Sequence, residues 1–299
     1  MTQQMTRRGF IERSSIMLAG VVLGDAHADA PSQRGPVRFG MLTDPHYADR
    51  DTYGSRFFRD SLDKMNAAVN DMNGRNLDFV IELGDFKDED APAITANTRH
   101  YLRRIESVFV TFHGPRYHVL GNHDMDSLSK PEFLAEIENT GIAPSSAHYA
   151  FDVKGLHCVA LDANYRADGV AYSHNNFDWT DANVPDAQLD WLRRDLAATH
   201  GPVVVFIHQR LDGEGDLFIN NAAAVRSILE ESGKTLAVLQ GHHHGGDYMQ
   251  IKGIHYYTLR GMVEGPGINN NAYAVVELTP DNALHITGYG MAASQRCEA

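Results

Sequence analysis

Seven side chains that could bind metal ions stand in five short segments, each of which follows a run of apolar residues. Carboxylate, amide and imidazole groups without a thiolate suit Mn, Fe, Zn or a similar divalent ion, and these ligand types do not choose among the metals. With this many groups, we expect two ions that share one bridging carboxylate. The candidate ligands are Asp44, His46, Asp85, Asn122, His208, His242 and His244.

Each segment taken alone has a simpler explanation. Asp44 precedes a proline, a pair that favours a turn, and His208 follows five apolar residues, where a histidine more often belongs to the core. The tract 241–245, with three consecutive histidines, is internal and is therefore no purification tag; histidine-rich tracts bind metals. If this tract is extended, His243 points away from its neighbours and is structural. It is the complete set that indicates a metal site.

Short apolar runs alternate with helical patterns from residue 36 onward, which predicts an α/β sandwich. In open α/β sheets, ligand sites form outside the carboxyl ends of the strands, and the candidate ligands stand at such ends. The strands that precede them are predicted at residues 37–42, 77–83, 117–120, 203–207 and 236–239.

The other elements follow from the same kinds of pattern. Apolar residues at steps of three and four predict an amphipathic helix over residues 58–74. A polar stretch at 163–184 predicts a long loop, and the helix after it begins near Pro185. No internal repeat or linker interrupts the pattern, so we expect a single domain over residues 29–299. A hairpin is predicted at 149–161 and further strands at 254–259, 272–278 and 284–287.

Residues 1–28 have the pattern of a cleaved signal peptide. Paired arginines at 7–8 precede an apolar run at 16–24, and Ala28 or Ala30 suits a signal peptidase. The paired arginines resemble a twin-arginine leader, which sends folded proteins through the membrane; an ordinary secretory signal is the alternative. We therefore expect the twin-arginine export machinery as a partner and a periplasmic or secreted protein. The apolar run is about half the roughly 20 residues that span a bilayer, so no membrane insertion is expected.

The composition restricts the partners. The chain has 299 residues, with 26 Lys and Arg against 39 Asp and Glu and a formal net charge of −13. Nucleic-acid binding relies on basic side chains that neutralise phosphates, so a nucleic-acid polymer is not expected as a partner. A small phosphorylated substrate fits if a metal supplies positive charge. Cys158 and Cys297 are expected to carry no function and no disulfide. The oligomeric state is left open.

The five segments resemble the motifs of the calcineurin-like metallophosphoesterase family. They are Asp-x-His, Gly-Asp, Gly-Asn-His-Asp, a strand-ending His and Gly-His-x-His, in the family order from residue 44 to residue 244. The resemblance implies two β-sheets in a sandwich flanked by helices, with a two-metal site at the carboxyl ends of the strands. It places Asp44, His46, Asp85 and His244 on one ion and Asp85, Asn122, His208 and His242 on the other.

The resemblance also implies catalytic residues. His123 would contact the phosphoryl or leaving oxygen, where it stabilises charge or donates a proton. Asp124 would orient that imidazole, as carboxylates commonly do. Two ions lower the pKa of a bridging water and hold the oxygens of an in-line displacement at phosphorus. The chain is thus expected to be an enzyme, a metal-dependent phosphoesterase.

Stretches outside the metal ligands are similar to the manganese-dependent ADP-ribose/CDP-alcohol diphosphatase branch of this family, among them residues 43–49, 56–62 and 259–264. This likeness implies Mn as the ion, with Fe and Zn as alternatives, and hydrolysis of diphosphate or phosphodiester bonds in small nucleotide-type substrates. The familiar eukaryotic members carry Gln where this chain has His46. The alternatives are a cyclic-nucleotide phosphodiesterase, a broad phosphomonoesterase and a non-catalytic metal or nucleotide binder.

Overall fold

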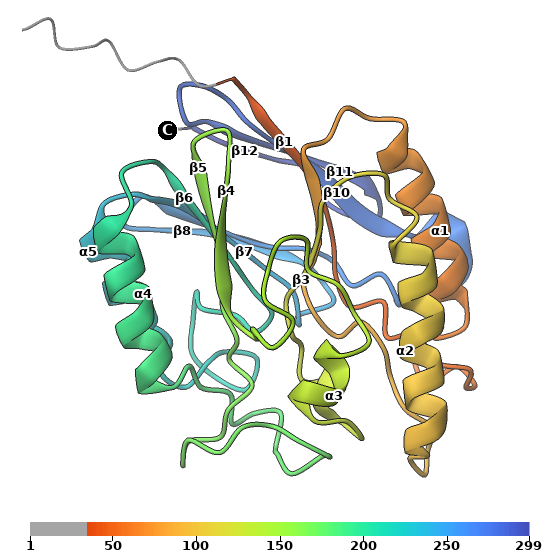
Figure 1. The fold of residues 1–299 in the computed structure, drawn as a ribbon. Helices are drawn as coiled ribbons and strands as arrows, with labels where there is room; N and C mark the ends of the chain where they lie inside the picture. Colours follow the sequence, from red (N-terminus) through yellow and green to blue (C-terminus); the bar gives the residue numbers. More distant parts are fainter. Residues whose placement is uncertain (1–34, 299) are drawn as a thin grey trace, which may run out of the picture. The chain divides into compact units, whose positions relative to one another are not determined.

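Two six-stranded β-sheets lie face to face in the computed structural model, which describes residues 35–298 (Figure 1). The predicted signal peptide lies outside the described residues. The first sheet runs in the order β12 (Gln295–Cys297), β11 (Leu284–Gly290), β10 (Ala272–Leu278), β1 (Val37–Leu42), β2 (Phe79–Glu82) and β3 (Arg116–His118). The second runs in the order β4 (Tyr149–Val153), β5 (Leu156–Ala160), β6 (Val203–Ile207), β7 (Thr235–Gln240), β9 (Ile254–Thr258) and β8 (Asp247–Ile251).

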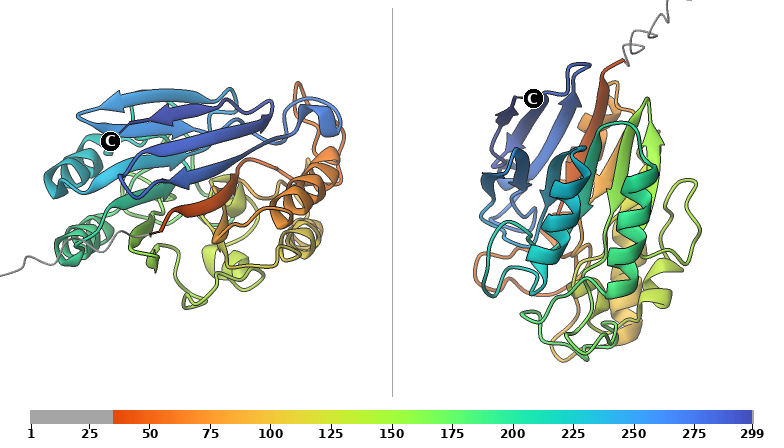
Figure 2. Two further views of the ribbon diagram at one scale, coloured as in Figure 1. Left: turned by 90° about the horizontal axis from the view of Figure 1, so that it is seen from above. Right: turned by 90° about the vertical axis from the view of Figure 1, so that its left-hand side faces the viewer.

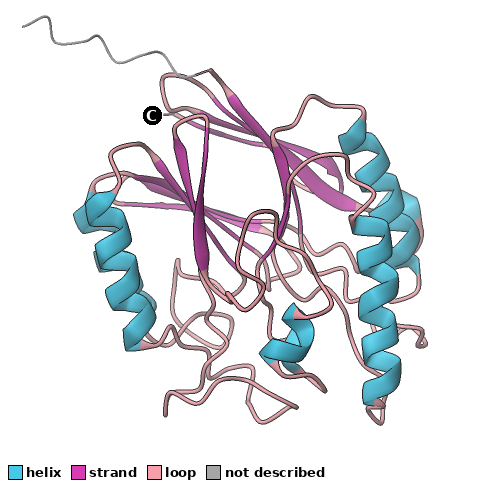
Figure 3. Cartoon of the chain, in the orientation of Figure 1, coloured by secondary structure: helices cyan, strands magenta, loops and turns pink. Residues whose placement is uncertain are grey.

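Each sheet has a parallel part. Strands β1, β2 and β3 pair in parallel, and so do β5, β6, β7 and β9. The other pairs, including β1 with β10, are antiparallel. Because parallel strands end at one edge of a sheet, the loops that follow β1, β2, β3, β6 and β7 gather on one side of the sandwich, below the strands in Figure 3.

Apolar side chains fill the space between the sheets. Phe39 of β1 stacks on Phe79 of β2 with ring centroids 4.7 Å apart, and Phe206 of β6 meets Phe39 edge-on at 5.6 Å. All three rings are fully buried in one apolar cluster to which both sheets contribute. This cluster holds the two sheets together and thereby positions their strand ends.

Helices cover the outer faces of the sandwich. Helices α1 (Asp60–Asn73) and α2 (Thr95–Phe109) lie over the first sheet, and α4 (Asp186–Ala198) and α5 (Ala222–Ser232) lie over the second (Figure 2). The short helix α3 (Lys130–Leu134) and the 3-10 turns η1 (His123–Met125) and η2 (Ile268–Asn270) belong to the loops. The predicted fold class, an α/β two-sheet sandwich flanked by helices, is confirmed.

Several local predictions are also confirmed. The helix predicted over 58–74 is α1, and Gly74 follows its last residue. The hairpin is β4 and β5, where Lys154 and Gly155 have φ of 48° and 82°, as a tight turn requires. Residues 163–184 form a loop that contains no helix and only isolated β-bridges. Helices α2 and α5 and strands β8 and β12 are not predicted by the sequence patterns.

Both cysteines are buried and free of a disulfide, as expected. Within residues 35–298, no helix combines the length and the apolar character needed to cross a membrane.

Candidate metal centre

Four of the candidate ligands have an unusual backbone conformation. Asp44, His46, Asp85 and His242 adopt φ of 51°, 44°, 56° and 67°. For a residue other than glycine, this left-handed region costs on the order of 1–3 kcal/mol, and such strain concentrates at functional sites. This conformation turns each side chain toward the site within four residues of the end of its strand.

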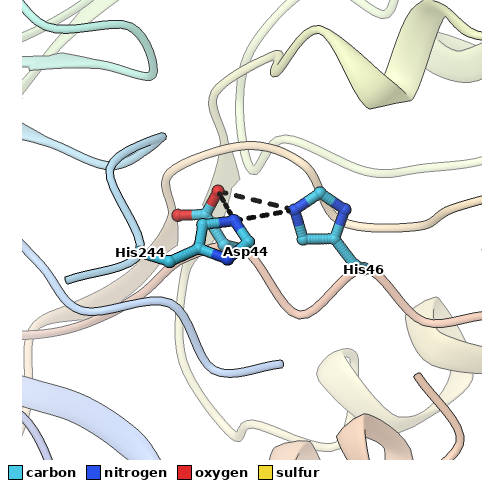
Figure 4. Close-up of side chains that lie close together, drawn as sticks. All are labelled: Asp44, His46 and His244. Carbon is cyan, nitrogen blue, oxygen red and sulfur yellow. Dashed lines mark hydrogen bonds and ion pairs between the residues drawn. The ribbon is translucent and has the colours of Figure 1, made fainter. Parts of the chain in front are cut away.

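Asp44, His46 and His244 form the first cluster, and their side chains point toward one another (Figure 4). Nε2 of His46 lies 3.1 Å from Nε2 of His244 and 3.7 Å from Oδ1 of Asp44. Nε2 of His244 lies 3.3 Å from the same aspartate oxygen. Two imidazole nitrogens and a carboxylate oxygen that converge on one point form a donor set for a divalent cation.

Asp85, His208 and His242 form the second cluster. Nε2 of His208 lies 3.2 Å from Oδ2 of Asp85 and 3.2 Å from Nδ1 of His242. The same Asp85 oxygen lies 3.5 Å from Nε2 of His46, which belongs to the first cluster. The Asp85 carboxylate therefore stands between the two clusters, where a bridging ligand would lie.

Neighbouring groups fix which atom each histidine presents. Nδ1 of His208 lies 2.8 Å from the carbonyl oxygen of Leu83, which can only accept, so Nδ1 donates and Nε2 is the nitrogen that faces the cluster. Nδ1 of His244 donates in the same way to the Glu264 carboxylate at 2.6 Å. Histidines that bind metals commonly have such a partner on the other ring nitrogen. Glu264 is a member of the site that the sequence patterns do not predict.

Two buried oxygens at the site show that the residues fit bound cations. Oδ1 of Asp44 and the side-chain oxygen of Asn122 are buried and have no hydrogen-bond partner. A buried acceptor without a partner is costly, whereas a coordinated ion would satisfy it. With two clusters around Asp85 and hard or borderline ligands throughout, the arrangement suits two divalent ions.

The electrostatics of the metal-free site agree with this interpretation. Burial alone would raise the pKa of the Asp44 and Asp85 carboxyls, but the nearby imidazolium groups outweigh it and hold both well below their usual range. Burial lowers the pKa of His208, yet the charges of Asp85 and Asp44 raise it to about 10. Burial and the positive charge of His208 lower the pKa of His242 to about 3. Protons thus supply the positive charge that the carboxylates need, and metal binding would release them.

Asp88 joins His46 to His123, a connection that the sequence analysis does not predict. Oδ2 of Asp88 lies 3.3 Å from Nδ1 of His46 and 3.7 Å from Nδ1 of His123, and the two imidazole rings meet edge-on at 4.6 Å. Burial lowers the pKa of His123, but the charges of Asp88 and Asp85 outweigh it and raise the pKa to about 9. Asp88 follows Asp85 by three residues, and no sequence pattern distinguishes it from an ordinary loop residue.

The expected role of Asp124 is wrong. Its Oδ1 accepts the backbone N–H of Phe86 at 2.9 Å, and its Oδ2 accepts the N–H groups of Gly121 and Asp85 at 2.8 and 3.1 Å. The carboxylate therefore holds the loops after β2 and β3 together and does not orient the His123 ring. In a 3-10 turn such as η1, the side chains of consecutive residues diverge, so Asp124 contacts the loop after β2 while His123 faces Asp88.

The remaining prediction concerns His243. His242 has a positive φ, so the tract is turned rather than extended, and Nδ1 of His243 lies 3.2 Å from the guanidinium of Arg210. His243 belongs to neither metal cluster among the described residues, which agrees with a structural role.

A two-sheet sandwich with aspartate and histidine clusters at the strand ends defines a class of metal-dependent hydrolases. The chain belongs to the calcineurin-like phosphoesterase family, whose model matches residues 21–246. It is a metallophosphoesterase, a metal-dependent hydrolase of phosphoester bonds, and the resemblance drawn from the motifs is confirmed.

Individual relatives share low sequence identity over most of the chain. A protein of Oryza sativa subsp. japonica named manganese-dependent ADP-ribose/CDP-alcohol diphosphatase is 26% identical, over 94% of this chain and 99% of that protein. A protein of Fibrobacter succinogenes named probable cyclic nucleotide phosphodiesterase is 25% identical, over 72% and 76% respectively. The crystal structure of a dimetal phosphatase from Danio rerio superposes with a TM-score of 0.76 at 22% identity, over 88% and 98%, and shows the shared fold.

Proposed function

We propose that the protein hydrolyses diphosphate bonds in small nucleotide derivatives of the ADP-ribose and CDP-alcohol class, with two bound divalent cations. The observation that carries this proposal is the pair of clusters around Asp85, with ligands from both sheets. The similarity to the rice diphosphatase over nearly the whole chain supports the substrate class. The manganese in that protein's name supports Mn as the ion, and metal analysis of the purified protein distinguishes it from Fe and Zn.

Each ion would be held by four side chains. When bound, the two ions supply the charge that holds phosphoryl oxygens and lowers the pKa of a water molecule. Glu264 and the Leu83 carbonyl keep His244 and His208 turned toward the ions. One ion would be bound by Asp44, His46, Asp85 and His244, and the other by Asp85, Asn122, His208 and His242.

His123 is positioned to protonate the leaving oxygen. Its side chain is 32% exposed, next to the buried His46, so it can reach a substrate bound at the clusters. The Asp88 carboxylate favours the protonated imidazole, which is the form that a general acid needs. Asp124 contributes indirectly, because it fixes the loop from which His123 projects.

A cyclic-nucleotide phosphodiesterase is the second candidate, and the similarity to the Fibrobacter protein favours it. His46 bears on this choice, because its Nε2 faces both clusters and the familiar eukaryotic diphosphatases carry Gln there. A broad phosphomonoesterase would use the same ligands and is the third possibility.

A substrate panel tests the proposal. The mature protein, purified without chelator and supplied with Mn, is assayed with ADP-ribose, CDP-choline, cyclic AMP, bis-p-nitrophenyl phosphate and p-nitrophenyl phosphate. We expect the highest kcat/KM for the first two. A preference for cyclic AMP or for the monoester would replace the proposal by the corresponding alternative, and no turnover in the presence of two bound ions would contradict it.

We also propose that the protein is exported through the twin-arginine machinery to the periplasm or beyond. The support is the motif of paired arginines before a short apolar run. Replacement of Arg7 and Arg8 by Lys should retain the protein in the cytoplasm of a bacterial host, as cell fractionation would show. Unchanged export would instead indicate an ordinary secretory signal.

A further inference from the structure

A cavity of about 640 Å³ opens directly beside the metal centre. Asn122 and His123 form the wall next to the clusters, and the loop after β2 and the long loop 163–184 form the rest. A group attached to a phosphorus atom at the clusters, on the side of His123, would therefore enter this cavity.

The cavity carries negative charge that the protein does not neutralise. Within residues 35–298, no basic side chain lies within 4.0 Å of the carboxylates of Glu89, Asp90 or Asp178, all of which line it. Asp90 accepts hydrogen bonds from the neutral side chains of Tyr101 and Asn97. Asp178 accepts from the backbone and hydroxyl of Thr180.

The cations in the cavity wall are already engaged. Nη1 of Arg50 lies 3.4 Å from Asp88 and 2.9 Å from the carbonyl oxygen of Glu89, and its guanidinium stacks over the Phe58 ring at 4.6 Å. His123 faces Asp88 as well. Neither one pairs with the carboxylates of Glu89, Asp90 or Asp178.

Buried oxygen atoms in the same wall point to a missing partner. Asp126 is only 4% exposed, and its Oδ2 has no hydrogen-bond partner, although its other oxygen is paired with Lys87. Oε2 of Glu89 is likewise buried and without a partner. A buried oxygen without a hydrogen-bond partner is costly in a low-dielectric environment, and a nearby positive charge reduces that cost.

An aromatic face completes the cavity. Trp179 is 43% exposed, and its ring lies 5.7 Å from the ring of His242, so it stands at the border between the cavity and the metal centre. Phe177 lies beside it and is held by stacking on Tyr172 at 4.1 Å. An indole face next to carboxylates is the arrangement that proteins use to bind organic cations.

We propose that this cavity binds the cationic alcohol portion of a diphosphate ester, an ammonium or trimethylammonium group, against Trp179, Glu89, Asp90 and Asp178. This inference rests on the proposed diphosphatase function and narrows its substrate class to nucleotide esters of amino alcohols. An anionic group is disfavoured in the same cavity, and a neutral sugar gains nothing from the unpaired charge.

The test compares two substrates that differ only in charge. CDP-choline is assayed beside its neutral isostere, in which carbon replaces the ammonium nitrogen, using the Mn-loaded enzyme. Because a cation on a tryptophan face gains attraction that a neutral group of equal shape does not, we expect kcat/KM for CDP-choline to be about tenfold higher or more. Equal values would overturn the proposal.

Variants of residues that line the cavity test whether the preference for CDP-choline over its neutral isostere arises there. In Trp179→Ala and in Asp178→Asn, the ratio of kcat/KM for CDP-choline to that for the isostere should fall toward one. Asp168→Asn is the matched control, because Asp168 lies in the same loop, pairs with Arg166 and does not line the cavity, so its ratio should equal that of the wild type. An unchanged ratio in both cavity variants would overturn the cation site. If kcat/KM also fell by the same factor for both substrates in Trp179→Ala, Trp179 would bind the nucleotide portion instead.

Different results would contradict the proposed diphosphatase function and the cation site. If the wild-type enzyme hydrolyses ADP-ribose and both CDP esters at similar kcat/KM, the proposed function stands and the cation site is wrong. If it hydrolyses none of them but cleaves cyclic AMP, the proposed function fails and the cation site fails with it.

Discussion

His123 is the residue whose loss should separate turnover from metal binding. Its backbone N–H, not its ring, donates to Oδ1 of Asp85 at 2.7 Å, so His123→Ala keeps that contact. We expect the variant to bind both ions and to lose about a hundredfold to ten-thousandfold in kcat, the usual contribution of a general acid. Elemental analysis and assays with bis-p-nitrophenyl phosphate measure the two quantities.

His200→Ala is the control for this experiment, because His200 is exposed in the loop after α4. Its metal content and kcat should match those of the wild type. Loss of metal from His123→Ala would contradict the role as proton donor and would make His123 part of the metal site.

Asp88 is expected to set the pH range in which His123 remains protonated. The carboxylate favours the imidazolium, so Asp88→Asn lowers the pKa of His123. A general acid is lost as the pH rises through its pKa, so the falling limb of the kcat profile should move to lower pH. Profiles of the Mn-saturated variant and of the exposed control Asp49→Asn provide the comparison. A falling limb at the wild-type position would exclude this role for Asp88.

Three glycines allow the strand ends to approach one another. A Cβ on Gly84 would lie 2.6 Å from Nδ1 of His208, one on Gly241 would lie 2.1 Å from the hydroxyl of Thr43, and one on Gly121 would lie 2.1 Å from the backbone nitrogen of Asp85. The glycines of the sequence motifs are therefore needed because the loops touch at these points, which a side chain would prevent.

Gly121→Ala should therefore harm both the fold and the metal centre. The Cβ would also lie 2.3 Å from the carboxylate of Asp85, so this carboxylate must move. We expect the free energy of unfolding to fall by about 1–3 kcal/mol, as for overpacking elsewhere, and metal affinity to fall with it. Urea unfolding and metal titration test this. Gly35→Ala, which meets no atom within 4 Å, should change neither, and wild-type metal affinity in Gly121→Ala would contradict the expectation.

The elements that the sequence predicts are those with a strong apolar period. Strands such as β6, buried at every position, and helix α1, with one apolar face, stand out from their neighbours. Helix α2 does not, because its buried face includes polar residues such as Thr98 and Glu106. Strand β8 is partly or fully exposed along its length, and β12 has only three residues, so neither leaves a hydrophobic pattern.

The residues of the site divide in the same way. Some are marked by the local sequence pattern, and others reach the site only through tertiary contacts. The seven candidate ligands are predictable because each lies within four residues of the end of a strand, and their order matches the family motifs. Asp88, Glu264 and Trp179 are not, because they meet His123, His244 and His242 only through contacts between separate loops. The role of Asp124 depends on how side chains diverge within a 3-10 turn. The spacing of residues along the chain does not show in which direction the Asp124 side chain points.

For the molecule as a whole, the metal centre connects the two sheets. His208, after β6, donates to the Leu83 carbonyl after β2, and the N–H of His242, after β7, donates to Oδ2 of Asp44 after β1. Ions held between these loops would stabilise the folded state by about 4 kcal/mol for each ion supplied at a thousandfold excess over its Kd. Chelation should therefore lower Tm by several degrees, and added Mn should restore it, as measured by calorimetry. An unchanged Tm would mean that the centre contributes nothing to stability.

This stabilisation should depend on pH in a direction set by the histidines. In the metal-free protein the pKa of His208 is raised from 6.5 to about 10, because Asp85 and Asp44 outweigh the opposing effect of burial. The stability from this raised pKa is fully present below about pH 6.5 and is lost as the pH rises toward 10. Metal binding requires neutral imidazoles, so the affinity for Mn rises over the same range. The difference in Tm between Mn-loaded and chelated protein should thus widen from about pH 6 to about pH 9. A difference that narrows would show that protons and ions do not compete for these side chains, and the assignment of His208 as a metal ligand would be wrong.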